Sequence, residues 1–137
     1  MIDFRAIALA VALTAALLLL GTAASARAEA GADKPTVVKI HANWCGTCAK
    51  LEGTWAELKT TYGDTANFVV FDVTDKAALK ESTAEAKRLG LTTIFDEYKS
   101  STGTIAVLDA DGKTLSVFKG VSDASKYDEA LGLACTS

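Results

Sequence analysis

The chain has 137 residues, which is enough for one ordinary domain and too few for two. Half of the residues are hydrophobic, so a buried core can form, and the net charge is −3 with a pI of about 5.1. Acidic and basic residues are interleaved along the chain, which excludes the basic patch or stripe that nucleic-acid binding needs.

Residues 1–30 have the composition of an export leader. Arg5 and the amino terminus carry positive charge, Ala6–Leu20 is almost entirely apolar or small, and further small residues follow. Secretory signal peptides show this order of regions. The alternative is an uncleaved membrane anchor, but the apolar run has about 15 residues whereas a membrane-spanning helix needs about 20. We therefore expect a signal peptide.

Three positions fit the small-residue pattern of a cleavage site, so the cut is expected after Ala26, Ala28 or Ala30. Residues 31–137 then form the mature domain. We expect this domain in the bacterial periplasm or an equivalent oxidising space, with membrane contact only if the leader is retained.

The first predicted element of the domain is a buried strand over Thr36–Ala42, which is rich in β-branched residues. Lys39 and His41 interrupt it and share one face, because side chains alternate along a strand. A helix is expected from Cys45 to about Tyr62. Its apolar face carries residues spaced three and four apart, namely Cys48, Leu51, Trp55, Leu58 and Tyr62.

A second strand and helix follow. Asn67–Val73 reads as another buried strand, and Thr74 or Asp75 can cap a helix that runs to about Leu89 and stops at Gly90. Two strand–helix units in succession favour a parallel strand pair with a right-handed crossover.

The last third of the chain predicts an irregular segment, a hairpin and a helix. The expected elements are an irregular connection over Leu91–Thr102, strands over Thr104–Asp109 and Thr114–Lys119 joined by a turn at Asp109–Gly112, and a closing helix capped by Ser122 or Asp123 that runs to about Leu133.

The stretch Trp44-Cys45-Gly46-Thr47-Cys48 lies where the first predicted strand meets the first predicted helix. Unpaired N–H groups and the helix dipole stabilise an anion at a helix N-terminus. Cysteines at such positions have pKa values of roughly 3.5–7.5, compared with about 8.5 for a free thiol. A disulfide across two intervening residues restrains the unfolded chain little. The pair is therefore interpreted as a redox couple.

The element order, with A-N-W-C-G-T-C at Ala42–Cys48 and S-T-G-T-I-A-V-L-D-A-D-G-K at Ser101–Lys113, resembles the thioredoxin-fold family over about Thr36–Leu133. The resemblance implies an α/β fold with a mixed four-stranded sheet of order 2-1-3-4 flanked by helices. It also implies a thiol-disulfide oxidoreductase in which Cys45 attacks a protein disulfide and Cys48 resolves the mixed disulfide.

The resemblance further implies reduction of protein partners, an unidentified partner that recycles the protein, and no organic cofactor or metal. The direction of electron flow stays open, because it depends on the relative stability of the two redox states.

The chain departs from the family at the position of its cis-proline, where it has Gly103. The only proline is Pro35, and cis bonds without proline cost about 2.5–4 kcal/mol, so we expect a trans Thr102–Gly103 bond. Thr102, Gly103 and Thr104 correspond to the substrate groove, which glycine could leave more open.

A second departure is Lys39, which replaces a buried aspartate of many thioredoxins. Lys39 either stabilises a nearby thiolate and makes the site more oxidising, or it extends to the surface and does neither. His41 either tunes the thiolate or packs beside the site. Gly46 and Thr47 lie between the cysteines and are expected to affect the potential.

Several other residues have two interpretations. Trp44 is expected to shield the cysteines and offer contact surface, whereas Trp55 is expected in the core. Phe95 and Tyr98 form either a partner-binding lip or ordinary packing. Cys135 is an odd cysteine near the end of the chain, available for pairing between chains or incidental.

The alternative functions are a metal-binding or metallochaperone module that uses Cys45, Cys48 and His41, and a redox-inert binding module. A closed zinc site needs four ligands, and only three such residues lie close in sequence. An intact CxxC argues against the inert module.

Overall fold

A computed structural model describes residues 33–136, so the predicted leader and its cleavage sites lie outside the described residues. The elements in chain order are β1 (Thr36–His41), α2 (Gly46–Lys50), α3 (Glu52–Tyr62), β2 (Asn67–Asp72), α4 (Lys76–Leu89), α5 (Thr92–Tyr98), β3 (Thr104–Leu108), β4 (Thr114–Lys119) and α6 (Ser125–Thr136). Over this part of the chain, no helix combines the length and the apolar character that crossing a membrane requires.

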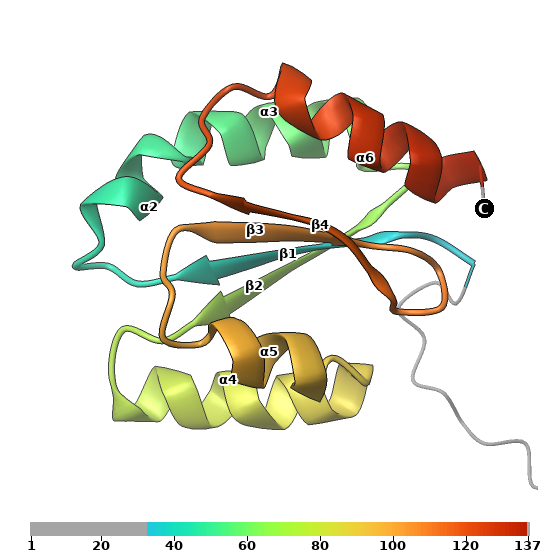
Figure 1. Ribbon diagram of the computed structural model, residues 1–137. Coiled ribbons are helices and arrows are strands. Elements are labelled where there is room, and N and C mark those ends of the chain that lie inside the picture. The colour runs from blue at the N-terminus through green and yellow to red at the C-terminus, as the bar shows by residue number, and fades with distance from the viewer. Residues whose placement is uncertain (1–32, 137) are drawn as a thin grey trace, which may run out of the picture.

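The four strands form one sheet of order β2-β1-β3-β4, as predicted. β1 pairs with β2 in parallel, and both β1–β3 and β3–β4 are antiparallel. Figure 1 shows α2, α3 and α6 over one face of the sheet and α4 and α5 over the other. The predicted thioredoxin-like arrangement is confirmed.

A hydrophobic core lies on each face of the sheet because the side chains of β1 alternate. Val37 packs with residues of α3 and α6, whereas Val38 and Ile40 pack with residues of β2, α4 and α5. Lys39 therefore lies on the α3 side of the sheet. Each fully buried Val, Leu, Ile or Phe side chain contributes about 1.5–3 kcal/mol.

The prediction of an irregular connection over Leu91–Thr102 is wrong, because α5 occupies most of it. Its apolar residues recur with helical spacing and pack into the core on the α4 side: Leu91, Ile94, Phe95 and Tyr98. A helix of seven residues is too short to be stable by itself, so tertiary packing of this apolar side stabilises it.

β2 is only partly buried, whereas the sequence predicts a buried strand. Phe71 is its one buried residue and Val70 is 45% exposed. The sheet order explains the difference, because β2 lies at the edge and one of its faces is incompletely covered.

The predicted helix from Cys45 to Tyr62 is divided at Leu51 into α2 and α3. The Leu51 amide donates to the carbonyl oxygens of both Thr47 and Cys48, at 3.2 and 3.1 Å. Such shared bonds mark a locally tightened turn. The apolar face is nevertheless continuous, since Cys48, Leu51 and Leu58 are all buried.

The ends of the remaining helices agree with their predicted signals. The Asp75 side chain accepts a hydrogen bond from the Ala78 amide at the start of α4, and Gly90 ends that helix with a φ of 71°. Asp123 accepts from the Ser125 amide and hydroxyl at the start of α6. α6 extends beyond the predicted Leu133 to Thr136.

Candidate functional site

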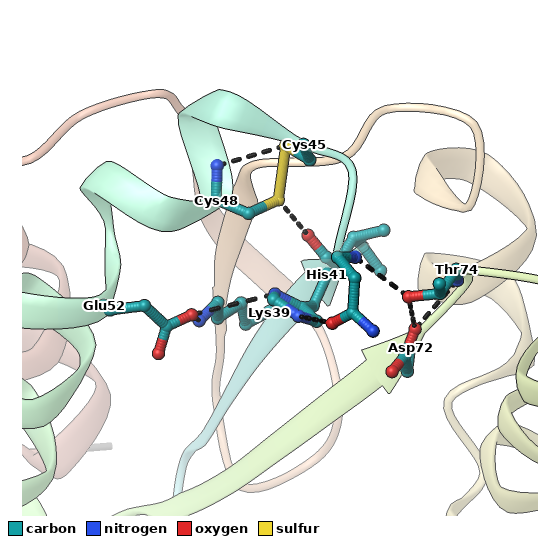
Figure 2. Close-up of polar contacts among 9 residues, drawn as sticks. Lys39, His41, Cys45, Cys48, Glu52, Asp72 and Thr74 are labelled. Carbon is teal, nitrogen blue, oxygen red and sulfur yellow. Dashed lines mark hydrogen bonds and ion pairs between the residues drawn. A yellow bond between two sulfur atoms is a disulfide. The ribbon is translucent and has the colours of Figure 1, made fainter.

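Cys45 and Cys48 form a disulfide at the start of α2, with their Cα atoms 5.2 Å apart (Figure 2). Cys45 is the N-cap residue of α2, and its Sγ accepts a hydrogen bond from the Cys48 amide at 3.1 Å. Cys45 is 9% exposed, whereas Cys48 is completely buried. The outer sulfur is thus the one that another molecule can approach, and helix N–H groups favour its anionic form.

β1 places the pair. The strand ends at His41, the Cys45 amide donates to the Ala42 carbonyl oxygen at 3.1 Å, and α2 begins at once. The Cys48 Sγ lies 3.8 Å from the Ile40 carbonyl oxygen. After reduction, the Cys48 thiol can donate a hydrogen bond to this oxygen.

The loop before Cys45 is attached to the end of β2. The Trp44 Nε1 donates to the Thr74 carbonyl oxygen at 3.0 Å, and the Asn43 amide donates to the Thr74 hydroxyl at 2.9 Å. The Thr74 hydroxyl in turn donates to Asp72, and this hydrogen bond lowers the pKa of the Asp72 carboxyl. Trp44 is 67% exposed even though its ring nitrogen is held.

The sequence did not predict this attachment. Thr74 was considered only as a helix cap, and Asp75 has that role. Nothing local in the sequence indicates that Asn43 and Thr74 meet, because 31 positions separate them.

Lys39 is buried beneath the cysteine pair and does not reach the surface. Its side chain is 2% exposed, and its Nζ donates to the Glu52 Oε1 at 2.5 Å (Figure 2). Its Nζ also lies 5.5 Å from the centre of the Trp55 ring, within the range of a cation–π contact. Sequence reasoning missed Glu52; its position one helical turn after Cys48 was the available signal.

His41 lies beside the same carboxylate. Its Nε2 is 3.2 Å from the Asn43 Oδ1, and its Nδ1 is 3.7 Å from the Glu52 Oε1. This buried Nδ1 has no hydrogen-bond partner among the described residues. The His41 imidazole thus lies between the Asn43 amide and the Glu52 carboxylate.

Gly103 comes into contact distance of the redox pair. It has a φ of 78°, and a Cβ built on it would lie 3.8 Å from the Cys45 Sγ and 2.7 Å from the Thr47 Cγ2. Its amide donates to the Ile40 carbonyl oxygen at 2.9 Å. No cis peptide bond occurs between residues 33 and 136, which agrees with the expected trans bond.

The other residues predicted for the substrate groove, and Gly46 between the cysteines, differ in burial. Thr102 is half-buried, whereas Thr104 is buried and donates a hydrogen bond from its hydroxyl to the Ser101 carbonyl oxygen. Gly46 is exposed, with open space where a side chain would begin.

The structure also places four other residues that the sequence analysis singled out. Phe95 is buried in the core on the α4 side, and Tyr98 packs against that core and lies under Lys119. Trp55 is in the core, as predicted. Cys135 is an exposed free cysteine in the last turn of α6, and that end of α6 lies across the domain from α2 (Figure 1).

Within residues 33–136, no three side chains of the His, Cys, Asp or Glu type gather closely enough to hold a metal ion. The alternative site made of Cys45, Cys48 and His41 is therefore not favoured. The two sulfurs are joined to each other.

Comparisons with known proteins agree with this geometry. The thioredoxin family model matches residues 22–87. A thiol:disulfide interchange protein TxlA homolog from Synechocystis sp. is 38% identical over 48 residues, which are 35% of this chain and 27% of that protein. The chain thus spans about a quarter of the length of this relative.

Solved structures show the same fold. A thiol:disulfide interchange protein of the thioredoxin family from Chlorobium tepidum has a TM-score of 0.53 at 23% identity, covering 75% of this chain and 81% of the other. A thioredoxin-like protein in its oxidized form has a TM-score of 0.52 at 19% identity, covering 76% and 79%. The chain thus has a thioredoxin-like fold, and the part of it that carries the cysteine pair matches the thioredoxin family model.

Proposed function

We propose that this protein is a thiol-disulfide oxidoreductase that exchanges its Cys45–Cys48 dithiol/disulfide with protein substrates and acts as a reductant in the periplasm. The observation that carries the proposal is the asymmetry of the pair, with Cys45 at the N-cap of α2 and partly accessible and Cys48 completely buried behind it. The match to the thioredoxin family model and the printed name of the Synechocystis relative support it.

The proposed reaction begins with the reduced pair. The Cys45 thiolate attacks one sulfur of a substrate disulfide, forms a mixed disulfide and releases the other substrate sulfur as a thiolate, which takes up a proton. The Cys48 thiol loses its proton and attacks the Cys45 sulfur, which breaks the mixed disulfide and releases the second substrate sulfur as a thiolate that takes up a proton. The substrate leaves with both cysteines reduced, and the two electrons have come from the Cys45–Cys48 pair.

The surface around Cys45 suits a polypeptide substrate. Trp44 offers exposed apolar surface beside Cys45, and Gly103 leaves the space above the Cys45 sulfur free of a side chain. Binding at such a surface needs an apolar anchor next to the reacting atom.

The periplasmic location is inferred from the composition of residues 1–30. In that compartment a reductant needs a separate partner that returns electrons to the pair, because the surroundings favour disulfides. We propose that such a partner reduces Cys45–Cys48 after each turnover. Cell fractionation of the full-length protein, with and without residues 1–30, tests the location.

The activity is tested by reduction of insulin with dithiothreitol as the electron source. We expect turnover by the protein, no turnover by Cys45→Ser, and normal turnover by Cys135→Ser, which is the matched control for removal of a thiol. Cys48→Ser should accumulate mixed disulfides with substrate. A protein that contains stoichiometric metal and does not turn over insulin would contradict the proposal and favour the metal-binding alternative.

The direction of electron flow is tested separately, by equilibrating the pair with mixtures of reduced and oxidised glutathione. A reductant keeps its disulfide when glutathione is only mildly reducing. A pair that glutathione reduces readily would instead be an oxidant.

A further inference from the structure

We infer that Glu52 is a positioning residue for the redox pair: it holds the buried Lys39 ammonium and neutralises it, so that this cation does not stabilise a thiolate at Cys45. The inference rests on the proposed function, in that it treats the pair as a redox couple. Glu52 is the group that determines the net charge next to that couple.

Lys39 is a charged group in an apolar place. Its side chain is 2% exposed, and Trp55 lies beside its Nζ. A buried charge is costly unless it is paired and hydrogen-bonded. The Glu52 carboxylate meets this need at 2.5 Å, and because Glu52 is 56% exposed it keeps part of its own hydration.

Few other charges are available to Lys39. Among the described residues, Glu52 is the only carboxylate within ion-pair distance of its Nζ. Asp72 is engaged by the Thr74 amide and hydroxyl. His41 faces the same Glu52 oxygen at 3.7 Å. An imidazole is neutral or positively charged, so His41 adds no negative charge beside Lys39.

The ion pair lies next to the cysteines along the chain and in space. Glu52 follows Cys48 by one helical turn, and Lys39 directly precedes Ile40, whose carbonyl oxygen lies 3.8 Å from the Cys48 Sγ. Figure 2 shows the Lys39–Glu52 pair beneath the disulfide, between β1 and the start of α3.

Replacing Glu52 by glutamine removes the negative charge, whereas the amide oxygen of glutamine can still accept the hydrogen bond of the Lys39 ammonium. Reduction then creates an anion at the start of α2, close to an uncompensated cation. A nearby opposite charge favours the charged form of a group. The reduced state is therefore stabilised, and the equilibrium of the pair with glutathione shifts toward the dithiol.

The experiment measures two quantities on the full chain and its variants: the equilibrium constant of the pair with glutathione, and the pKa of Cys45 from thiolate absorbance. In Glu52→Gln we expect the equilibrium constant for reduction to rise roughly tenfold, with a lower Cys45 pKa. Glu52→Asp should restore most of the wild-type value, because it restores the charge.

Two controls make the result specific. Glu57→Gln removes the same charge from an exposed position of the same helix and should change neither quantity. In a Lys39→Met background, Glu52→Gln should have no further effect, because the cation that Glu52 neutralises is gone.

An equilibrium constant that is unchanged in Glu52→Gln, or that changes equally in the Lys39→Met background, overturns the inference while leaving the proposed function intact. A pair that dithiothreitol cannot reduce would remove the proposed function and this inference with it.

Discussion

Gly103 and Thr47 are fitted to each other across the redox site. A Cβ on Gly103 would lie 2.7 Å from the Thr47 Cγ2, and a Cβ on Gly120 would lie 3.2 Å from the same methyl group. Thr47, one of the two residues between the cysteines, thus packs against the glycine that precedes β3 and the glycine that follows β4. The Gly120 amide also donates to the Gly103 carbonyl oxygen at 2.9 Å, which keeps the two glycines together.

We predict that Gly103→Ala destabilises the oxidised protein by about 2–5 kcal/mol. The left-handed backbone costs a non-glycine residue about 1–2 kcal/mol, and overpacking adds typically 1–3 kcal/mol. The measurement is urea unfolding followed by circular dichroism. Reduced access to the Cys45 sulfur should also slow insulin reduction.

Gly112→Ala is the matched control, because Gly112 has a φ of 84° and no atom within 4 Å of its missing Cβ. It should show the backbone cost alone. Thr47→Ser removes the methyl group and should recover about 1 kcal/mol in the Gly103→Ala background. If Gly103→Ala and Gly112→Ala lose the same free energy of unfolding, the contact with Thr47 does not contribute to the cost of Gly103→Ala.

The cap of α4 gives a second prediction. Asp75→Ala removes the acceptor of the Ala78 amide and should lower the free energy of unfolding by about 1 kcal/mol. Asp75→Asn should cost much less, because asparagine caps nearly as well. The midpoints of urea unfolding of the two variants test this prediction. If both variants lose the same stability, the Asp75 carboxylate has a role other than capping.

We predict that the buried Tyr127 makes the stability of the protein fall at alkaline pH. Burial raises its pKa from 10.0 to about 12, and its hydroxyl donates to the Val121 carbonyl oxygen at 2.7 Å. A raised folded-state pKa contributes stability that is fully present below the unfolded value, near pH 10, and is lost as the pH rises through about 12. Unfolding free energy should therefore decline over this range.

Tyr127→Phe should flatten that decline while costing about 0.5–1.5 kcal/mol at neutral pH through the lost hydrogen bond. Urea unfolding at a series of pH values measures both effects. Tyr62, whose pKa is raised to about 12 chiefly by its hydrogen bond to Asp128, is more exposed, so Tyr62→Phe should flatten the decline less. If the unfolding free energy of Tyr127→Phe declines with pH as steeply as that of the wild type, Tyr127 is not the cause of the decline.

Trp44 is expected to act on protein substrates rather than on the chemistry of the disulfide. Trp44→Ala removes an exposed ring beside Cys45, and truncation of an interface anchor costs upwards of about 1 kcal/mol, or roughly fivefold in rate. Insulin reduction should fall by that factor, while reduction of the Cys45–Cys48 disulfide by dithiothreitol should be unchanged. Equal slowing of both reactions would assign Trp44 to the redox step.

Local patterns in the sequence were sufficient for the four strands, the position of the cysteine pair and most helix ends. These features depend on residues within a few positions of one another, such as the alternation in β1, the spacing along α3, and the signals at Asp75 and Gly90. The resemblance to a known fold then supplied the topology that local patterns leave open.

Only the tertiary structure decided which distant residues meet. It made a helix of the segment after Gly90 and left Val70 exposed at a sheet edge. It also placed Glu52 on Lys39 and Gly103 against Thr47. These contacts depend on how helices and loops pack across the sheet, and no short sequence window contains that information, because burial and charge pairing are properties of the assembled fold.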